Sequence, residues 1–142
     1  MDRKKVFVDT SAWYALQITD DANHRQARDI FPRLFNKYQD LLTSNHVIGE
    51  TYTLLRTSKG YREARQFLDI LCRSPRLEEY FAAHQIEREA LGLLHQYQDH
   101  PFSFVDGVTF CIMKKEGIQD AFSFDSHFRI AGYNRVGIDI PL

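Results

Sequence analysis

The chain is poor in the residues on which secreted proteins and zinc proteins depend. It has only 2 cysteines in 142 residues, too few for a disulfide framework. Cys72 and Cys111 are not spaced as a metal clip, and each stands beside apolar residues in a predicted helix, so we expect reduced, buried thiols. The 6 histidines show no H-x-x-x-H or H-E-x-x-H spacing, which argues against a zinc site.

Long apolar runs and a strong net charge are also lacking. No stretch approaches the roughly 18 consecutive apolar residues of a membrane span, and the apolar run at residues 6–8 is too short for a signal peptide. We therefore expect a cytoplasmic protein with no membrane association. The formal net charge is -1, so any binding of nucleic acid must come from a local basic patch.

Bulky apolar residues, in contrast, are plentiful. Hydrophobic residues make up 44% of the chain and aromatic residues 13%, which is ample material for one core and argues against disorder. The length is typical of one domain, and no repeat, linker or low-complexity tract divides it. We expect a single domain over residues 1–142.

Short apolar runs alternate with longer segments of helical periodicity. Strands are predicted at residues 6–8, 41–43, 77–81, 121–124 and 136–140. Helices are predicted at residues 22–38, 45–58, 61–72, 85–97 and 103–116, the first with a break near Phe31 caused by Pro32. Apolar strands separated by helices indicate an α/β fold. We expect a three-layer sandwich, with a short parallel sheet of four to five strands covered by helices on both faces.

Two acidic residues directly follow predicted strands. Asp9 comes after the strand at residues 6–8, and Asp125 comes after the strand at residues 121–124. In an open parallel sheet, ligands bind beyond the carboxyl ends of the strands, so both side chains are candidates for a site there. The alternative is that each caps the following helix, although Thr10 or Ser11 could cap as well as Asp9.

Two further acids stand in helices. Asp106 lies three residues after Ser103 in the pattern of a helix capping box, and the helix that follows is apolar nearly all round. A capping role and a functional role are compatible there. Glu50 flanks the apolar stripe of the helix at residues 45–58, where an unpaired carboxylate would need a partner or a metal. The alternative is that Glu50 extends outward into solvent.

Convergence of these four carboxylates would need a compensating cation. Two unit charges about 4 Å apart repel by about 4 kcal/mol at an effective dielectric constant of 20. Ligands that are all oxygen atoms select Mg²⁺ or Mn²⁺ over zinc. A carboxylate-held ion with open positions for water and phosphate is equipped to hydrolyse a phosphodiester.

The motifs that carry these acids resemble those of the PIN-domain nucleases, and in particular the VapC-type toxins of toxin–antitoxin pairs. The matching segments are VFVDTSAWYAL, IGETYTLLR, FSFVDGVTFCIMKK and AFSFDSHF, in the family's order and at its spacing. The resemblance spans nearly the whole chain. It implies a PIN-like fold and metal-dependent cleavage of single-stranded RNA, which leaves a 5′-phosphate and a 3′-hydroxyl.

The resemblance also implies roles and partners. Asp9, Glu50, Asp106 and Asp125 would hold one or two Mg²⁺ or Mn²⁺ ions, with Asp125 more often a second-metal or water-mediated ligand. Thr10 or Ser11 would contact metal-bound water or phosphate, and Ser103 would support the site. A toxin of this kind is expected to form a homodimer and to have an antitoxin protein as its partner. A basic stretch from Arg56 to Arg76 could hold RNA phosphates or simply be a solvated helical face.

Three alternative functions compete with this resemblance, and the first fits the sequence poorly. A phosphatase of the haloacid-dehalogenase type expects a second Asp two residues after the first, where this chain has Ser11. A non-catalytic module that binds RNA or protein would be marked by the loss of acids, and all four are present. A PIN-fold RNA-processing nuclease without an antitoxin would share every residue of the site.

Overall fold

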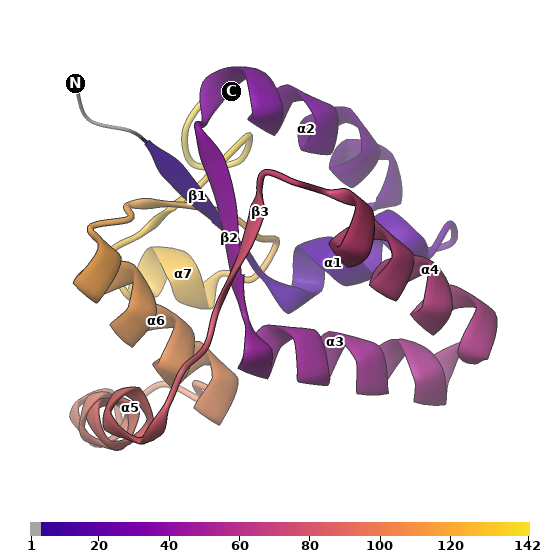
Figure 1. Ribbon diagram of the computed structural model, residues 1–142. Helices are drawn as coiled ribbons and strands as arrows, with labels where there is room; N and C mark the ends of the chain where they lie inside the picture. Colours follow the sequence, from indigo (N-terminus) through magenta and orange to yellow (C-terminus); the bar gives the residue numbers. More distant parts are fainter. Residues whose placement is uncertain (1–3) are drawn as a thin grey trace.

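The computed structural model describes residues 4–142, so the first three positions of the expected domain lie outside the described residues. The chain alternates strands and helices, as Figure 1 shows. The strands are β1 (Lys5–Val8), β2 (Asp40–Ser44), β3 (Leu77–Tyr80), β4 (Asp120–Phe122) and β5 (Asn134–Arg135). The helices are α1 (Thr10–Gln17), α2 (His24–Lys37), α3 (Asn45–Ser58), α4 (Tyr61–Arg73), α5 (His84–Gln96), α6 (Phe104–Glu116) and α7 (His127–Ile130).

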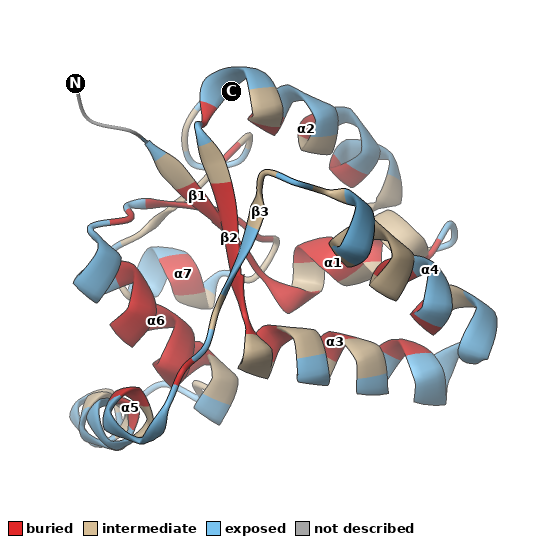
Figure 2. Ribbon diagram, viewed as in Figure 1, coloured by how far each residue is buried: buried red, intermediate tan, exposed pale blue. Residues whose placement is uncertain are grey.

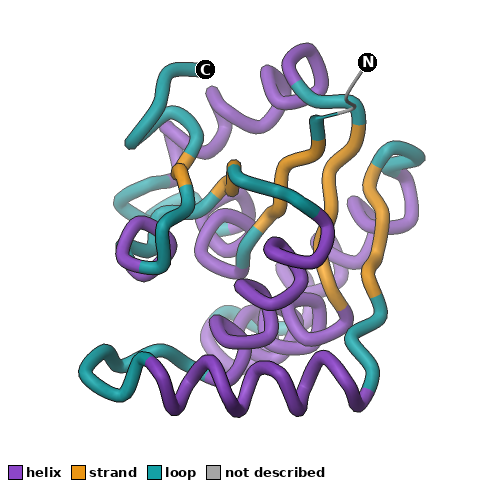
Figure 3. The backbone as a smooth tube through the Cα atoms, turned by 90° about the vertical axis from the view of Figure 1, so that its left-hand side faces the viewer, coloured by secondary structure: helices purple, strands orange, loops and turns teal. Residues whose placement is uncertain are grey.

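The five strands form one parallel sheet in the order β3-β2-β1-β4-β5. β1 lies at its centre, with Phe7 paired to Leu42 of β2 on one side and to Ala121 of β4 on the other. Figure 3 shows the strands side by side and the connection from β3 into α5. Because all strands are parallel, the residues that follow β1, β2 and β4 meet at the same edge of the sheet.

Helices cover both faces of this sheet. Figure 1 shows α1, α2, α3 and α4 on one side of the strands and α5, α6 and α7 on the other. β4 is buried along its whole length, β1 and β2 at every position after the first, and much of α6 is buried too, whereas the edge strand β3 is half-exposed (Figure 2). The expected α/β three-layer sandwich with a parallel sheet is confirmed, with five strands.

The helix ends follow the predicted capping chemistry. The Ser44 hydroxyl accepts a hydrogen bond from the Val47 backbone N–H at 3.1 Å and so caps α3. At the start of α6 the predicted capping box is complete, since Ser103 and Asp106 each bond the other's backbone N–H at 3.0 Å. Gly117 ends α6 in the left-handed conformation, with a φ of 66°.

The structure corrects three predictions about local structure. α2 runs without a break through Pro32, because the carbonyl of Arg28 that loses its helical partner lies on the exposed side, where water can replace it. The predicted strand at residues 136–140 is wrong. The last strand is Asn134–Arg135, and Val136 and Ile140 form only an isolated bridge around a turn.

The third correction concerns a cysteine. Cys111 is buried as expected, but Cys72 is exposed in the last turn of α4; both are free thiols. Within the part of the chain that the structure describes, no helix combines the length and apolar character needed to cross a membrane.

Candidate active site at the carboxyl edge of the sheet

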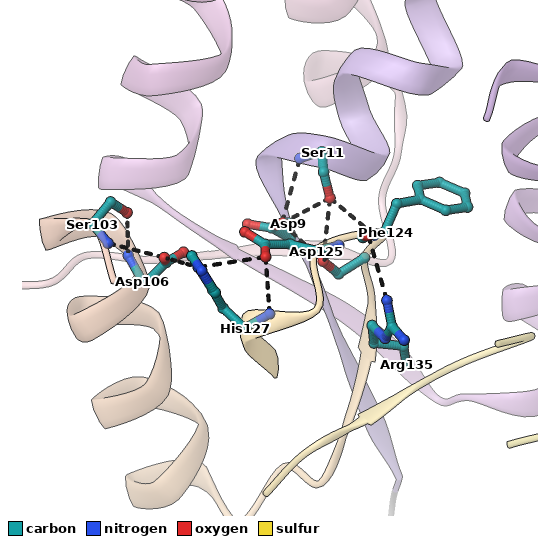
Figure 4. Close-up of polar contacts among 9 residues, drawn as sticks. Asp9, Ser11, Ser103, Asp106, Phe124, Asp125, His127 and Arg135 are labelled. Carbon is teal, nitrogen blue, oxygen red and sulfur yellow. Dashed lines mark hydrogen bonds and ion pairs between the residues drawn. The ribbon is translucent and has the colours of Figure 1, made fainter. Parts of the chain in front are cut away.

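Three of the four predicted acids meet at the carboxyl edge of the sheet. Asp9 directly follows β1, the segment after β4 runs through Ser123 to Asp125, and the first turn of α6 carries Asp106 toward both (Figure 4). Asp9 and Asp106 are buried, with only 5% and 7% of their surface exposed, and Asp125 is half-buried. The adjacency of β1 and β4 therefore joins residues from the two ends of the sequence.

Two serine hydroxyls hold one oxygen of Asp9. The Oγ atoms of Ser11 and Ser123 donate to Asp9 Oδ2 at 2.9 and 3.0 Å. Each hydroxyl in turn accepts a backbone N–H at 3.0 Å, from Phe124 for Ser11 and from Asp125 for Ser123. The backbone after β4 thus orients the two hydroxyls, and the hydroxyls orient the carboxylate. Asp9 also accepts a longer bond of 3.4 Å from the Ser11 backbone N–H as the cap of α1.

The electrostatics of Asp9 reflect its burial. Loss of hydration raises the pKa of Asp9 to about 6, and repulsion from Asp106 acts in the same direction. The hydrogen bonds from Ser11 and Ser123 favour the charged form and oppose this rise. A carboxylate under this strain would gain from a cation beside it.

A histidine links the other two acids. His127 Nδ1 lies 3.0 Å from Asp106 Oδ2 and 3.4 Å from Asp125 Oδ1, and the His127 backbone N–H donates to Asp125 Oδ1 at 2.9 Å. Asp106 Oδ2 also accepts the Ser103 backbone N–H of the capping box. One ligand atom each from Asp106, Asp125 and His127 lie within 4.8 Å of one another. The three side chains are therefore spaced to hold a metal ion.

The three carboxylates share one pattern. In each, one oxygen is held by the protein: Oδ2 of Asp9, Oδ2 of Asp106 and Oδ1 of Asp125. The second oxygen of each accepts no side-chain hydrogen bond from residues 4–142. The buried Thr10 Oγ1 beside Asp9 is likewise without a partner among these residues. Hard oxygen donors left open in a buried cluster are the donor set that Mg²⁺ and Mn²⁺ bind.

The structure does not join Glu50 to this cluster. Glu50 is half-buried in α3 and makes no hydrogen bond or ion pair with any described residue. It does lie one helical turn after His46, whose ring contacts Phe104 at the start of α6 with 5.7 Å between ring centroids. Its position is thus on the face of α3 that is turned toward the start of α6.

Two basic residues of the stretch between residues 56 and 76 make polar contacts within the fold. The Lys59 ammonium pairs with Asp20 at 3.3 Å. Arg76 donates to the backbone carbonyl of Gln39 at 3.0 Å, at the amino edge of the sheet where β2 and β3 begin. Both cations are therefore engaged by partners within the fold.

Sequence reasoning missed two residues of the cluster, Ser123 and His127. Both lie in the segment AFSFDSHF, which was used only for Asp125. The available signal was their spacing, since Ser123 precedes Asp125 by two positions and His127 follows it by two. Residues so close to a strand end reach the same edge of the sheet as the acid between them.

The fold is an α/β fold with a parallel sheet, and carboxylates with unbonded oxygens gather at the carboxyl edge of that sheet. Together these features indicate a protein that binds a divalent cation at this edge. The PIN domain family matches residues 6–132, and the chain belongs to this family. It is 38% identical over 131 residues to the 23S rRNA-specific endonuclease VapC20 of Mycobacterium tuberculosis, in both strain CDC 1551 and strain H37Rv. This match covers 92% of the chain and 97% of the relative.

Solved structures agree with this assignment. The crystal structure of Mycobacterium tuberculosis VapC20, described as a sarcin–ricin loop cleaving toxin, matches with a TM-score of 0.80 and 36% identity, over 90% of this chain and 95% of that one. FitAcB from Neisseria gonorrhoeae matches with a TM-score of 0.61 and 12% identity, over 92% of this chain and 94% of that one. At that identity the second match shows the fold alone.

Proposed function

We propose that this protein is a metal-dependent endoribonuclease that hydrolyses phosphodiester bonds in unpaired RNA. The observation that carries the proposal is the trio of Asp9, Asp106 and Asp125, each with one oxygen held by the protein and the other open. Membership of the PIN-domain family and the similarity to VapC20 support the same reaction.

The residues have separate tasks in this reaction. The open oxygens of Asp9, Asp106 and Asp125 would bind one or two Mg²⁺ or Mn²⁺ ions. Glu50, which extends from α3, is proposed as a fourth acidic ligand. A bound divalent cation supplies Lewis acidity for the scissile phosphate and for the attacking water. Ser11 orients Asp9, Ser103 orients Asp106 through its backbone N–H, and Thr10 offers a free hydroxyl to phosphate or water.

The substrate and partners are proposed from the relatives. VapC20 is named for its action on 23S rRNA, so we propose that this chain cuts 23S rRNA at an exposed loop. We also propose that it acts in the cytoplasm as a homodimer, as a single domain over residues 1–142, and as the toxin paired with an antitoxin protein. A PIN-fold processing nuclease without an antitoxin is the second candidate, which the absence of a neighbouring antitoxin gene would favour.

The central experiment is cleavage of purified 23S rRNA with Mg²⁺ or Mn²⁺, with and without EDTA. Cleavage should require the metal and should be lost in Asp9→Asn and Asp106→Asn, which remove one ligand charge each. Asp29→Asn is a matched control, because Asp29 lies on α2 with its side chain 69% exposed. Cleavage that persists in both site variants contradicts the assigned site. Binding of RNA without cleavage would instead identify a non-catalytic module.

A further inference from the structure

We infer that His127 is a positioning residue that fixes Asp106 and Asp125 relative to each other and so directs their open oxygens toward the ion. The inference rests on the proposed function and assigns a part of the site that the four acids leave unexplained. His127 is the first residue of the short helix α7, directly after the segment between β4 and α7 that carries Asp125.

The proton on Nδ1 follows from the partners of the ring. A charged carboxylate can only accept hydrogen bonds, so the 3.0 Å contact between His127 Nδ1 and Asp106 Oδ2 requires that Nδ1 carry the proton and donate it. The same nitrogen lies 3.4 Å from Asp125 Oδ1. The imidazole is thus a donor placed between two carboxylates that would otherwise repel each other.

The ring itself is held from two sides. The His127 backbone N–H donates to Asp125 Oδ1 at 2.9 Å, which fixes the backbone from which the side chain extends. The imidazole also packs against Phe102, with 5.1 Å between ring centroids and an interplanar angle of 57°. Only 22% of the His127 side chain is exposed, so its position is set by packing as well as by the hydrogen bonds.

His127 therefore does for Asp106 what the serines do for Asp9. Ser11 and Ser123 occupy Oδ2 of Asp9, while His127 and the Ser103 backbone N–H occupy Oδ2 of Asp106. In both acids the remaining oxygen is left for the ion. Partners that orient metal ligands in this way typically change metal affinity by about 10–100-fold when they are removed.

Direct ligation by His127 is the competing role. Its Nδ1 lies close enough to the two carboxylates to share an ion with them, and imidazole nitrogen is a common ligand of transition-metal ions. A ligating Nδ1 must lack its proton, however, and could no longer donate to Asp106 Oδ2. The two roles therefore differ in whether nitrogen bonds the metal.

Two substitutions separate the hydrogen bond from the packing. His127→Phe keeps a ring against Phe102 but removes the donor, whereas His127→Asn keeps an N–H donor near the position of Nδ1. Mn²⁺ affinity should be measured by calorimetry without RNA. We expect His127→Phe to bind Mn²⁺ about 10–100-fold more weakly and His127→Asn to recover part of this loss. His95→Phe, at an exposed position on α5, is the control and should leave Mn²⁺ affinity unchanged.

Kinetics and pulsed electron paramagnetic resonance complete the test. His127→Phe should lower kcat for purified 23S rRNA and leave KM unchanged, and wild-type protein with Mn²⁺ should show no directly coordinated ¹⁴N. Unchanged Mn²⁺ affinity in His127→Phe, equal losses in both variants, or a coordinated ¹⁴N signal would each overturn the positioning role. Wild-type protein that neither binds Mn²⁺ nor cuts RNA would overturn the proposed function itself, and this inference with it.

Discussion

Replacing Ser123 with alanine removes two hydrogen bonds from the acidic edge at once. The Ser123 hydroxyl donates to Asp9 Oδ2 and accepts the Asp125 backbone N–H, both at 3.0 Å, and its side chain is completely buried. Leaving that N–H without a partner costs about 1–3 kcal/mol. The free energy lost with the hydrogen bond to Asp9 is limited, because Asp9 can take up a proton instead. Its pKa is about 6, so protonation at pH 7 costs only about 1.4 kcal/mol.

The two terms predict that Ser123→Ala lowers the free energy of unfolding by about 2–4 kcal/mol in metal-free protein at pH 7. Ser11→Ala removes the equivalent pair of bonds, to Asp9 and from Phe124, but Ser11 is only half-buried. Water can therefore replace the lost hydroxyl, and the cost should be smaller, about 1–2 kcal/mol.

Urea denaturation in EDTA measures both variants against Ser126→Ala, an exposed position whose side chain makes no capping bond. That control should stay within about 0.5 kcal/mol of wild type. The reasoning depends on burial of Ser123, so it is refuted if Ser11→Ala proves as destabilising as Ser123→Ala or more so.

Three further predictions concern protonation, packing and metal. The raised pKa of Asp9, about 6 against 3.8, means that the folded protein binds a proton there more readily than the unfolded chain. Asp9 should therefore raise metal-free stability by about 2 kcal/mol as pH falls from 7 to 4, and Asp9→Asn should remove this gain in urea denaturation. A Cβ added at Gly92 would have no atom within 4 Å, whereas a Cβ added at Gly107 would lie 3.0 Å from Leu94 Cγ. Thermal unfolding should thus show Gly92→Ala more stable by about 1 kcal/mol and Gly107→Ala without that gain. Mn²⁺ at about 100 times its Kd should stabilise wild type by about 2.7 kcal/mol in the same assay and leave Asp9→Asn unaffected.

The central strands of the sheet could be predicted from the sequence, but the last edge strand could not. β1, β2 and β4 are buried on both faces, so each appears in the sequence as an uninterrupted apolar run. β5 has only two residues and lies at the edge, so its pairing depends on its neighbour rather than on its own pattern. The unbroken helix through Pro32 depended on which side of α2 faces solvent, which propensity does not give.

The sequence identified those residues of the candidate site that follow a strand or cap a helix. Asp9 and Asp125 follow strands, so the sequence places these two at one edge of the sheet. The capping-box pattern of Asp106 does not place it there, and only the family resemblance joined it to the other two. Ser123 and His127 were not predicted, because serine and histidine next to an acid are common and α7 is only 4 residues long. Glu50 remains a prediction, since its helix is correctly placed but its carboxylate has no partner among the described residues.

The placement of β4 between β1 and β5 has a consequence for how the protein becomes active during its synthesis. Asp9 leaves the ribosome 114 residues ahead of Ser123, whose hydroxyl orients it, and further still ahead of the acid Asp125. A nascent chain that ends before β4 has neither, and its first strand lacks one of its two neighbours. Translation through Asp125 therefore precedes assembly of the acidic edge.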